Sequence, residues 1–431
     1  MVASELGAGI HLASELGAGH PAMALHPATV IPFVVLIFAI AFLPLTHPHF
    51  WESHRNKAVV SALLAAPILA LLILRDPALL LHTGMEYFSF IVLLGSLFTI
   101  SGGIFLRGDL RATPVNNTAM LALGAFIANL VGTTGASMLL IRPLLRTNSE
   151  RLNTGHIPIF FIFLVSNIGG SLTPLGDPPL FLGYLRGVPF FWTLRLFLPW
   201  LTAMGLVLAV FLVLDLRAWR RELPAARALD AARIEPLAID GKRNFLFLAA
   251  VVAAAFQATP LREAIMLAAA VLAYFTTPKE NHARNGFHFG PIAEVAILFA
   301  GIFVTMVPAL ILLRTHAPEL GITEPWQFFW LTGGLSAFLD NAPTYLTFLS
   351  LAQGLGLASE VAGVPARLLT AISLGAVFMG AMTYIGNGPN FMVKAVVEEA
   401  GLKMPSFFGF LAYSSVILIP IFLIVCWVFL G

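Results

Sequence analysis

Charged residues are scarce in this sequence of 431 residues. Asp, Glu, Lys and Arg make up 11% of the chain and hydrophobic residues 58%, whereas soluble domains carry about 25% charged residues. This composition excludes an ordinary soluble domain and predicts an all-α polytopic membrane protein. The formal net charge is only +2, so no nucleic-acid partner is expected.

Cysteine and N-terminal basic residues are also nearly absent. Cys426 is the single cysteine, which excludes intramolecular disulfides and any multi-cysteine metal site. The first 27 residues contain no Lys or Arg, so they lack the basic region of a signal peptide. They hold two copies of Ala-Ser-Glu-Leu-Gly-Ala-Gly, and we interpret them as a weakly ordered extension.

Two apolar segments are interrupted by Gly, Pro and polar residues. In the first, Gly169–Pro179 separates the apolar runs 157–168 and 180–184. Proline predicts that the helix stops near Thr173 and restarts near Pro178. The second interruption, Gly380–Asn390, places Gly386-Asn387-Gly388-Pro389 opposite Gly176-Asp177-Pro178-Pro179. Paired broken helices in matching positions indicate the binding site of a secondary transporter.

Apolar runs long enough to span a bilayer, about 17–25 residues, follow the same order in two halves of the chain. Each half has three spans, a 30-residue interrupted segment expected to be a re-entrant hairpin, a broken span and a last span. The first half comprises 28–45, 58–74, 86–106, 116–147, 156–184 and 190–214, and the second 243–258, 264–277, 291–313, 325–354, 368–400 and 407–430.

Each half crosses the membrane five times. Because this number is odd, the second half starts on the opposite side of the membrane from the first, so the halves are expected to be inverted repeats. The predicted division is an N-terminal extension (1–27), a first repeat (28–214), a cytoplasmic linker (215–242) and a second repeat (243–431). Lys and Arg are concentrated on the side of the linker, which the positive-inside rule places in the cytoplasm. The six on the other side are Arg75, Arg186, Arg195, Arg262, Arg314 and Arg367. Both termini are therefore expected outside the cytoplasm, in a bacterial inner membrane.

The hairpin tips and breaks bring together an oxygen-rich set of residues with two carboxylates and no Lys, Arg or His. The set comprises Asn129, Thr133 and Thr134 (first hairpin), Thr173, Gly176 and Asp177 (first break), Asp340, Asn341 and Thr344 (second hairpin), and Thr383, Asn387 and Asn390 (second break). Hard cations such as Na⁺ bind oxygen ligands, and unwound helix ends add backbone carbonyls.

A carboxylate at bilayer depth is costly to ionise, so it is expected to hold either a proton or a cation. Competition between the two at Asp177 and Asp340 would suffice for exchange of Na⁺ for H⁺. Other interpretations stay open at this point. Either aspartate could cap a restarted helix, and the amides and hydroxyls could satisfy broken backbone.

The segments Gly169–Pro179, Phe338–Thr344 and Gly386–Asn390 resemble the signature segments of the ion transporter superfamily. That superfamily includes NhaD-type sodium/proton antiporters, arsenite permeases, citrate–metal transporters and divalent-anion/sodium symporters. The resemblance implies inverted repeats with re-entrant hairpins, a homodimer built on a scaffold domain, and elevator-type movement. The chain is most similar to the sodium/proton antiporter or citrate-transporter-like branch.

Two transport functions are compatible with these residues. Sodium/proton antiport is favoured, with Asp177 and Asp340 as Na⁺ ligands, Na⁺ as the transported ion and no other cofactor. The alternative is a cation-coupled citrate, organic-anion or metal–citrate carrier, because helix N-termini can hold anions and Lys394 follows the second break by one turn. Two aspartates would repel such an anion unless a cation neutralises them.

The hairpin tips also depart from the dicarboxylate symporters. Those relatives carry Ser-Asn-Thr at both tips, whereas the matching residues here are Ala128-Asn129-Leu130 and Asp340-Asn341-Ala342. An enzyme or an ATP-driven pump is not expected, because the chain has no Gly-x-x-x-x-Gly-Lys-Ser/Thr phosphate loop and no large soluble domain.

Overall fold

The computed structural model describes residues 25–431, and helices account for most of them. The greater part of the predicted extension 1–27 therefore lies outside the described residues. Seven helical stretches are long and apolar enough to cross a membrane: Pro27–Thr46, His54–Arg75, Pro77–Gly102, Pro114–Thr147, Phe190–Arg220, Gly290–Leu320 and Phe407–Phe429. The expectation of a polytopic all-α membrane protein is confirmed.

The first half follows the predicted order of elements. It contains η1 (Pro27–Val30), α2 (Ile31–Thr46), α3 (Pro48–Trp51), α4 (His54–Arg75), α5 (Pro77–Gly102), β1 (Phe105–Arg107), α6 (Pro114–Thr147), α7 (His156–Leu164), η2 (Ile168–Leu172), α8 (Pro178–Leu185), η3 (Phe190–Leu196) and α9 (Phe197–Arg220). Proline stands at the first position of α5, α6 and α8, where its missing N–H leaves no helical hydrogen bond unmade.

The second half is built from shorter pieces. After α10 (Pro224–Ala232) and β2 (Ala238–Asp240), which lie between the halves, it contains α11 (Asn244–Ala254), α12 (Leu261–Thr276), α13 (Lys279–Arg284), α14 (Gly290–His316), η4 (Ala317–Leu320), α15 (Pro325–Phe338), α16 (Asn341–Gly354), α17 (Ala366–Met379), η5 (Gly380–Met382), α18 (Gly388–Glu399) and α19 (Phe407–Phe429).

The stretch between the halves has more structure than a linker. Helix α9 continues to Arg220, and α10 and β2 follow it. Strand β2 pairs antiparallel with β1, with Phe105 opposite Asp240 and Leu106 opposite Ile239. That pairing joins segments more than 130 residues apart. Each strand has only three residues, which is too short to show an alternating hydrophobic pattern in the sequence.

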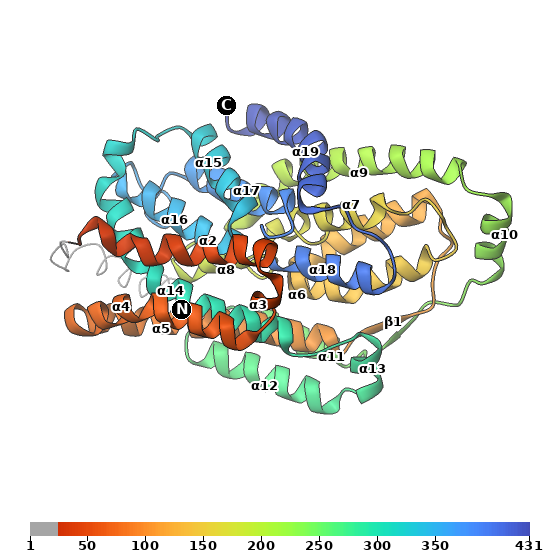
Figure 1. Cartoon of the computed structure of the whole chain (residues 1–431), viewed down its shortest axis with the longest axis horizontal. Coiled ribbons are helices and arrows are strands. Elements are labelled where there is room, and N and C mark those ends of the chain that lie inside the picture. Colours follow the sequence, from red (N-terminus) through yellow and green to blue (C-terminus); the bar gives the residue numbers. More distant parts are fainter. Residues whose placement is uncertain (1–24) are drawn as a thin grey trace, which may run out of the picture.

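Most helices run along the long axis of the molecule, with α10 and β1 near one end and α15 and α16 near the other (Figure 1). Helix α15 packs against α17, α14 against α4 and α16, and α12 against α5. Apolar side chains also cover the outside, as at Leu74 and Trp427, which are both 81% exposed. An exposed apolar face of this kind suits contact with lipid.

Both 30-residue interrupted segments fold back on themselves, as predicted. Helix α6 has a non-helical residue at Gly132 (φ 78°, ψ 154°). Asn117 near its start and Asn148 just beyond its end exchange two side-chain hydrogen bonds of 2.9 Å, although a straight helix would place them about 46 Å apart. In the second hairpin, α15 and α16 are separated at Leu339 and Asp340, and they lie side by side.

Candidate functional site

Asp177 lies in the first helix break, where the chain is extended (φ −144°, ψ 142°) just before α8. Its side chain is 1% exposed. The carboxylate does not cap α8, since it accepts no hydrogen bond from the first turn of that helix. Asp177 thus stands at the N-cap position of α8, as expected, but its carboxylate makes no capping hydrogen bond and is available to other segments.

The carboxylate of Asp177 accepts three hydrogen bonds, each from a different interrupted segment. Oδ1 accepts from Thr133 Oγ1 at 2.8 Å and from Asn387 Nδ2 at 3.0 Å. Oδ2 accepts from Asn341 Nδ2 at 2.6 Å. The three donors are themselves buried and lie 44, 210 and 164 residues from Asp177 along the chain. The structure thus brings both hairpins and both breaks together at one carboxylate.

All three donors are neutral groups. Among the described residues, no Lys, Arg or His forms an ion pair with Asp177. A buried carboxylate normally requires a positive partner or a proton, because desolvation of the charge is not repaid by neutral contacts alone. The site can therefore hold a positive charge that the chain does not itself supply.

Four helices begin beside this carboxylate. Thr133 starts the second arm of α6 after Gly132, Pro178 starts α8, Asn341 starts α16 and Gly388 starts α18. A helix N-terminus carries about half a positive charge and favours negative groups. These helix starts stabilise an ionised Asp177, and they also suit a carboxylate brought in by a ligand.

Other predicted residues hold the broken backbone together. Thr173 Oγ1 donates to the carbonyl of Asn129 at 2.5 Å, and the side-chain oxygen of Asn129 accepts from the amide of Leu172 at 2.7 Å. In the second half Thr383 Oγ1 donates to the carbonyl of Ala337. Backbone satisfaction is thus the contact that the structure shows for Asn129, Thr173 and Thr383.

Gly176 is required by a close approach of two backbones. A Cβ at Gly176 would lie 2.2 Å from the carbonyl oxygen of Gly170, which is far inside contact distance. The matching Gly386 is in the same situation, with its Cβ 2.6 Å from the carbonyl oxygen of Gly380. The amide of Thr133 also donates to the Gly176 carbonyl at 2.8 Å, so the first hairpin tip lies directly on the first break.

A further asparagine, Asn167, joins the two breaks and was not among the predicted residues. It is fully buried. Its Nδ2 donates to Asn390 Oδ1 at 2.7 Å, and its Oδ1 accepts from Asn387 Nδ2 at 3.3 Å. The polar pair Ser166-Asn167 in an otherwise apolar run was the signal that could have identified it.

Asn341 has one atom that its surroundings leave unsatisfied. Its Nδ2 binds Asp177, but its Oδ1 is buried and has no hydrogen-bond partner within the described residues. A buried acceptor without a partner costs about 1–3 kcal/mol. An oxygen of this kind, next to a carboxylate, is a suitable ligand for a cation or for a protonated group.

A family model described as "Putative citrate transport" matches residues 22–430 of the chain. The protein belongs to this citrate-transporter family of the ion transporter superfamily. Relatives named as uncharacterized transporters of Mycobacterium bovis and Mycobacterium tuberculosis are each 24% identical over 392 residues, covering 84% of this chain and 90% of theirs. A 46 kDa membrane protein of Mycobacterium leprae is 24% identical over 418 residues, covering 87% and 93%.

Membership of the citrate-transporter family confirms the resemblance found in the sequence and the expectation of a transporter rather than an enzyme. In this member of the family, Asp340 is separate from the hydrogen bonds of Asp177. Its Oδ1 accepts from the amide of Ala342 at 3.0 Å, which is the helix-capping role left open above. Half-buried Asp340 also lines a small cavity with Ile37 and Ile302.

The remaining predicted residues lie at the edge of the cluster. Thr344 Oγ1 donates to the carbonyl of Asp340 at 2.9 Å, and Thr134 is half-buried with no side-chain hydrogen bond within residues 25–431. Asn390 Nδ2 donates to the carbonyls of Gly380 and Thr383, each at 2.8 Å. Asp177, Thr133, Asn341 and Asn387 thus form the centre, which we call the Asp177 cluster.

Proposed function

We propose that this transporter exchanges Na⁺ for H⁺ at Asp177. The observation that carries the proposal is the buried carboxylate of Asp177, whose three hydrogen-bond donors are all neutral. Removing an unpaired charge from water costs several kcal/mol. The carboxylate is therefore most stable when it binds either a proton or a cation, and the two ligands exclude each other.

The oxygen atoms of the Asp177 cluster suit a hard cation. Both carboxylate oxygens of Asp177, the unpartnered Oδ1 of Asn341 and the hydroxyl of Thr133 belong to one group of contacting residues. Hard cations bind such oxygen ligands. We keep Asp340 in the proposal as a second carboxylate, since it caps α16, the helix that Asn341 begins.

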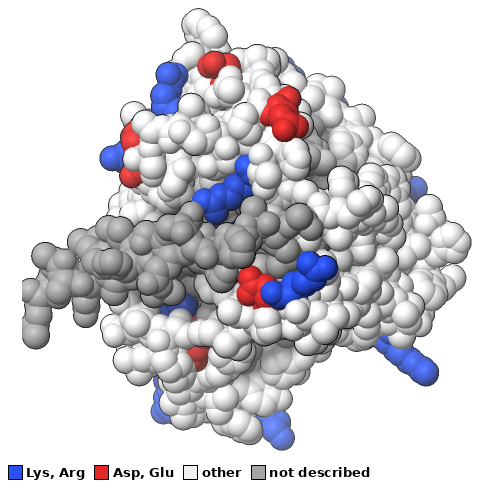
Figure 2. All heavy atoms as spheres, turned by 90° about the vertical axis from the view of Figure 1, so that its left-hand side faces the viewer, with Lys and Arg blue, Asp and Glu red and all other residues white. Residues whose placement is uncertain are grey.

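We also propose that residues 28–214 and 243–431 are inverted repeats that move as an elevator in a homodimer. Corresponding contacts support the repeat: Thr173 bonds the first hairpin and Thr383 the second through a hydroxyl-to-carbonyl bond. The end of the molecule opposite α10 is largely white, with scattered charged side chains of both signs (Figure 2), whereas arginines cluster in and around α10, at Arg217, Arg220, Arg221, Arg227 and Arg233. By the positive-inside rule α10 would lie in the cytoplasm and both termini outside. The membrane would be a bacterial inner membrane.

Citrate, alone or as a metal complex, is the second candidate substrate. The description of the matched family favours it. The four helix starts also favour it, because they could hold a substrate carboxylate once Asp177 is neutralised by a proton or metal ion. No described Lys, Arg or His is paired with Asp177. A bound anion would therefore interact with the dipoles of the helix N-termini and not with a positively charged side chain.

A proteoliposome assay separates the two candidates. Purified protein is reconstituted with a pH-sensitive dye inside, and Na⁺, Li⁺, K⁺ and citrate with and without Mg²⁺ are added in turn. Na⁺-dependent proton movement that is lost in Asp177→Asn but kept in Asp240→Asn, a carboxylate outside the cluster, supports antiport. Uptake of radiolabelled citrate without any Na⁺-dependent proton movement replaces antiport by citrate transport.

A further inference from the structure

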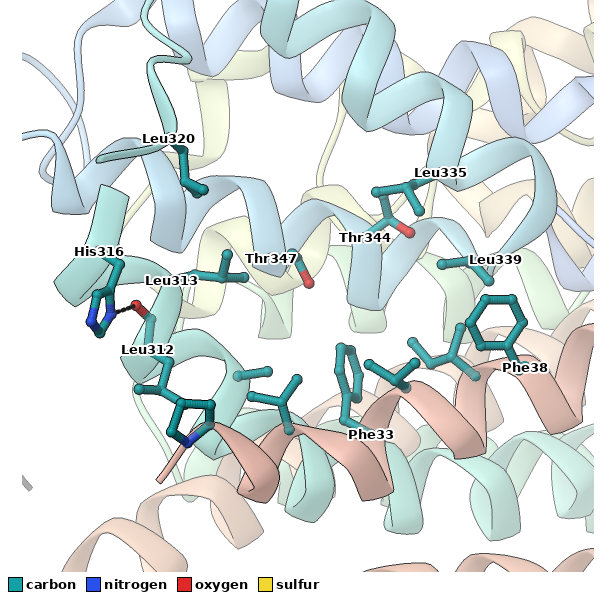
Figure 3. A pocket seen from close by; sticks show the side chains of 15 residues that line it. Phe33, Phe38, Leu312, Leu313, His316, Leu320, Leu335, Leu339, Thr344 and Thr347 are labelled. Atoms are coloured by element: carbon teal, nitrogen blue, oxygen red, sulfur yellow. Dashed lines mark hydrogen bonds between the residues drawn. The ribbon is translucent and has the colours of Figure 1, made fainter. Parts of the chain in front are cut away.

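A cavity of about 510 Å³ is lined by helices α2 and α14 and by the hairpin formed by α15 and α16. Figure 3 shows that side chains from all four helices point into it. Its wall is almost entirely apolar, with Phe33 and Phe38 from α2, Leu313 from α14, Leu335 from α15 and Leu339 from the tip between α15 and α16. Its volume falls within the range of about 300–1,000 Å³ typical of small-molecule sites.

The two threonines in the wall do not make it polar. Thr344 donates its hydroxyl to the carbonyl of Asp340 at 2.9 Å, and Thr347 donates to the carbonyl of Pro343 at 2.8 Å. Both hydroxyl hydrogens are therefore used within their own helix. A cavity that is apolar throughout stays free of water and binds apolar ligands.

The rim of the cavity is exposed on the apolar face of the protein. Val34 on α2 is 41% exposed and Leu335 on α15 is 43% exposed, and both line the cavity. Helix α2 is part of a stretch long and apolar enough to span a membrane. A hydrocarbon chain can therefore enter from the side, without passing through water.

Nitrogen donors lie at one end of this apolar space. His316, in the last turn of α14, lines the cavity, and its Nδ1 donates to the carbonyl of Leu312 at 3.0 Å (Figure 3). Arg314 does not itself line the cavity, but it follows the cavity-lining Leu313 on α14, is exposed, and has no ion-pair partner within the described residues. A guanidinium beside the mouth of an apolar cavity complements a phosphate that is attached to a hydrocarbon chain.

We propose that this cavity binds one acyl chain of an anionic glycerophospholipid, whose phosphate lies beside Arg314 and His316. The proposal does not depend on which ion or substrate is transported. It connects to the Asp177 cluster through α16, which forms one wall of the cavity and begins at Asn341. A bound lipid would therefore support the hairpin that positions Asn341.

The first test fills the cavity. Val34→Trp places a large side chain on a cavity-lining residue, and Val35→Trp is a matched control, because Val35 is 44% exposed on the same helix and does not line the cavity. Native mass spectrometry of the detergent-solubilised protein with added phosphatidylglycerol measures the bound lipid. We expect at least a fivefold loss of bound phosphatidylglycerol in Val34→Trp only. Equal retention in both variants, or equal loss in both, overturns the proposal.

The second test removes the charge of Arg314, beside the cavity-lining Leu313. Arg314→Gln is compared with Arg75→Gln, an exposed arginine at the end of α4. One arginine near an anionic lipid headgroup changes affinity about fivefold. Only Arg314→Gln is expected to lose that factor for phosphatidylglycerol, with phosphatidylcholine binding unchanged. An equal effect of Arg75→Gln contradicts the assigned headgroup position.

The third test identifies the occupant directly. A photo-crosslinking amino acid at Val34 is activated in native membranes, and the mass of the adduct is measured. An adduct with the mass of a phospholipid supports the proposal. Adducts with residues 1–24 of the same chain, whose next described residues lead into the cavity-lining Pro27, or with a second copy of the protein, refute it.

Discussion

Replacement of Asp177 by Asn should change folding stability little, replacement by Ala should lower it, and both should abolish transport. Asparagine keeps the shape of the side chain and removes only the charge. Its new NH₂ group needs an acceptor, and the buried Oδ1 of Asn341, which has no partner within the described residues, can supply one after a flip of that amide. The hydroxyl of Thr133 can likewise rotate to suit the new group.

The magnitudes follow from the three hydrogen bonds at Asp177. Asp177→Asn removes a charge that is costly to bury, so the lost charge-assisted bonds and the relieved desolvation largely cancel. We expect a change in unfolding free energy within about 1 kcal/mol. Asp177→Ala leaves the donors of Thr133 and Asn341 without this acceptor, and each orphaned buried donor costs about 1–3 kcal/mol. Asn387 Nδ2 keeps the carbonyl of Ser166 and Oδ1 of Asn167 as acceptors.

The chain contains its own reporter for this comparison. Cys426, the single cysteine, is buried in α19, so a thiol-reactive dye labels it only when the protein unfolds. One kcal/mol shifts the midpoint of thermal unfolding by about 1–2 °C in a chain of this length, extrapolating from smaller domains. Asp177→Ala should therefore melt several degrees below Asp177→Asn, and both should lose ion exchange in proteoliposomes.

Two results would refute this reasoning. If Asp177→Ala melts at the same temperature as Asp177→Asn, the carboxylate does not hold the four helix starts together. If Asp177→Asn sustains Na⁺-dependent proton movement at the wild-type rate, the charge of Asp177 has no part in transport. The first result concerns the fold and the second the function, so the two assays are independent.

Three further predictions test the packing and the electrostatics around the site. Gly176→Ala should abolish the yield of monodisperse protein in size-exclusion chromatography, because the new Cβ would lie 2.2 Å from a backbone oxygen, whereas Gly388→Ala has no atom within 4 Å and should be tolerated. Arg186→Ala removes the 2.9 Å partner of buried Glu86 and leaves it only His82 at 3.4 Å; it should destabilise by about 1.5–3 kcal/mol in the same melting assay, with the loss reduced when Glu86→Gln is added. For Glu222, beyond the end of α9, burial raises the pKa, but two backbone amides that donate to it hold the pKa below its ordinary value of 4.5. Its stabilisation is therefore present above pH about 4.5 and lost as the pH falls through the lowered pKa. The hydrogen-exchange protection factor of the loop before α7, taken relative to the intrinsic exchange rate at each pH, should therefore fall only on acidification; an unchanged protection factor would contradict this.

Much of the fold could be predicted because its signals are local. A proline cannot continue a helix, so Pro178 and the Gly169-Gly170 pair marked the first break in the sequence itself. The turn of α6 at Gly132 was expected from a 30-residue apolar stretch with a polar, glycine-containing centre, and the structure places a positive φ there. The choice of Asp177 as a candidate site residue also followed from the sequence, since an ionisable residue in an apolar membrane segment usually has a function.

The roles of the other polar residues could not be predicted in the same way. Asp340 and Asp177 are both aspartates at interruptions of apolar segments. In the structure, however, Asp340 caps a helix, whereas Asp177 accepts hydrogen bonds from three side chains. Asn129 and Asn341 occupy matching hairpin tips, yet Asn129 binds backbone and Asn341 binds the carboxylate. These differences depend on which way each side chain points after the halves have met.

Taken alone, the sequence determined where the helices break, that the protein spans a membrane, and that an acidic residue lies at one of the breaks. Each of these depends on residues that are neighbours in the chain, through proline sterics, apolar run length and charge. Tertiary structure alone decided that Thr133, Asn341 and Asn387 meet at Asp177 and that Asn167 links the two breaks. Those contacts join residues up to 223 positions apart, and no local pattern encodes which distant partner a buried amide will find.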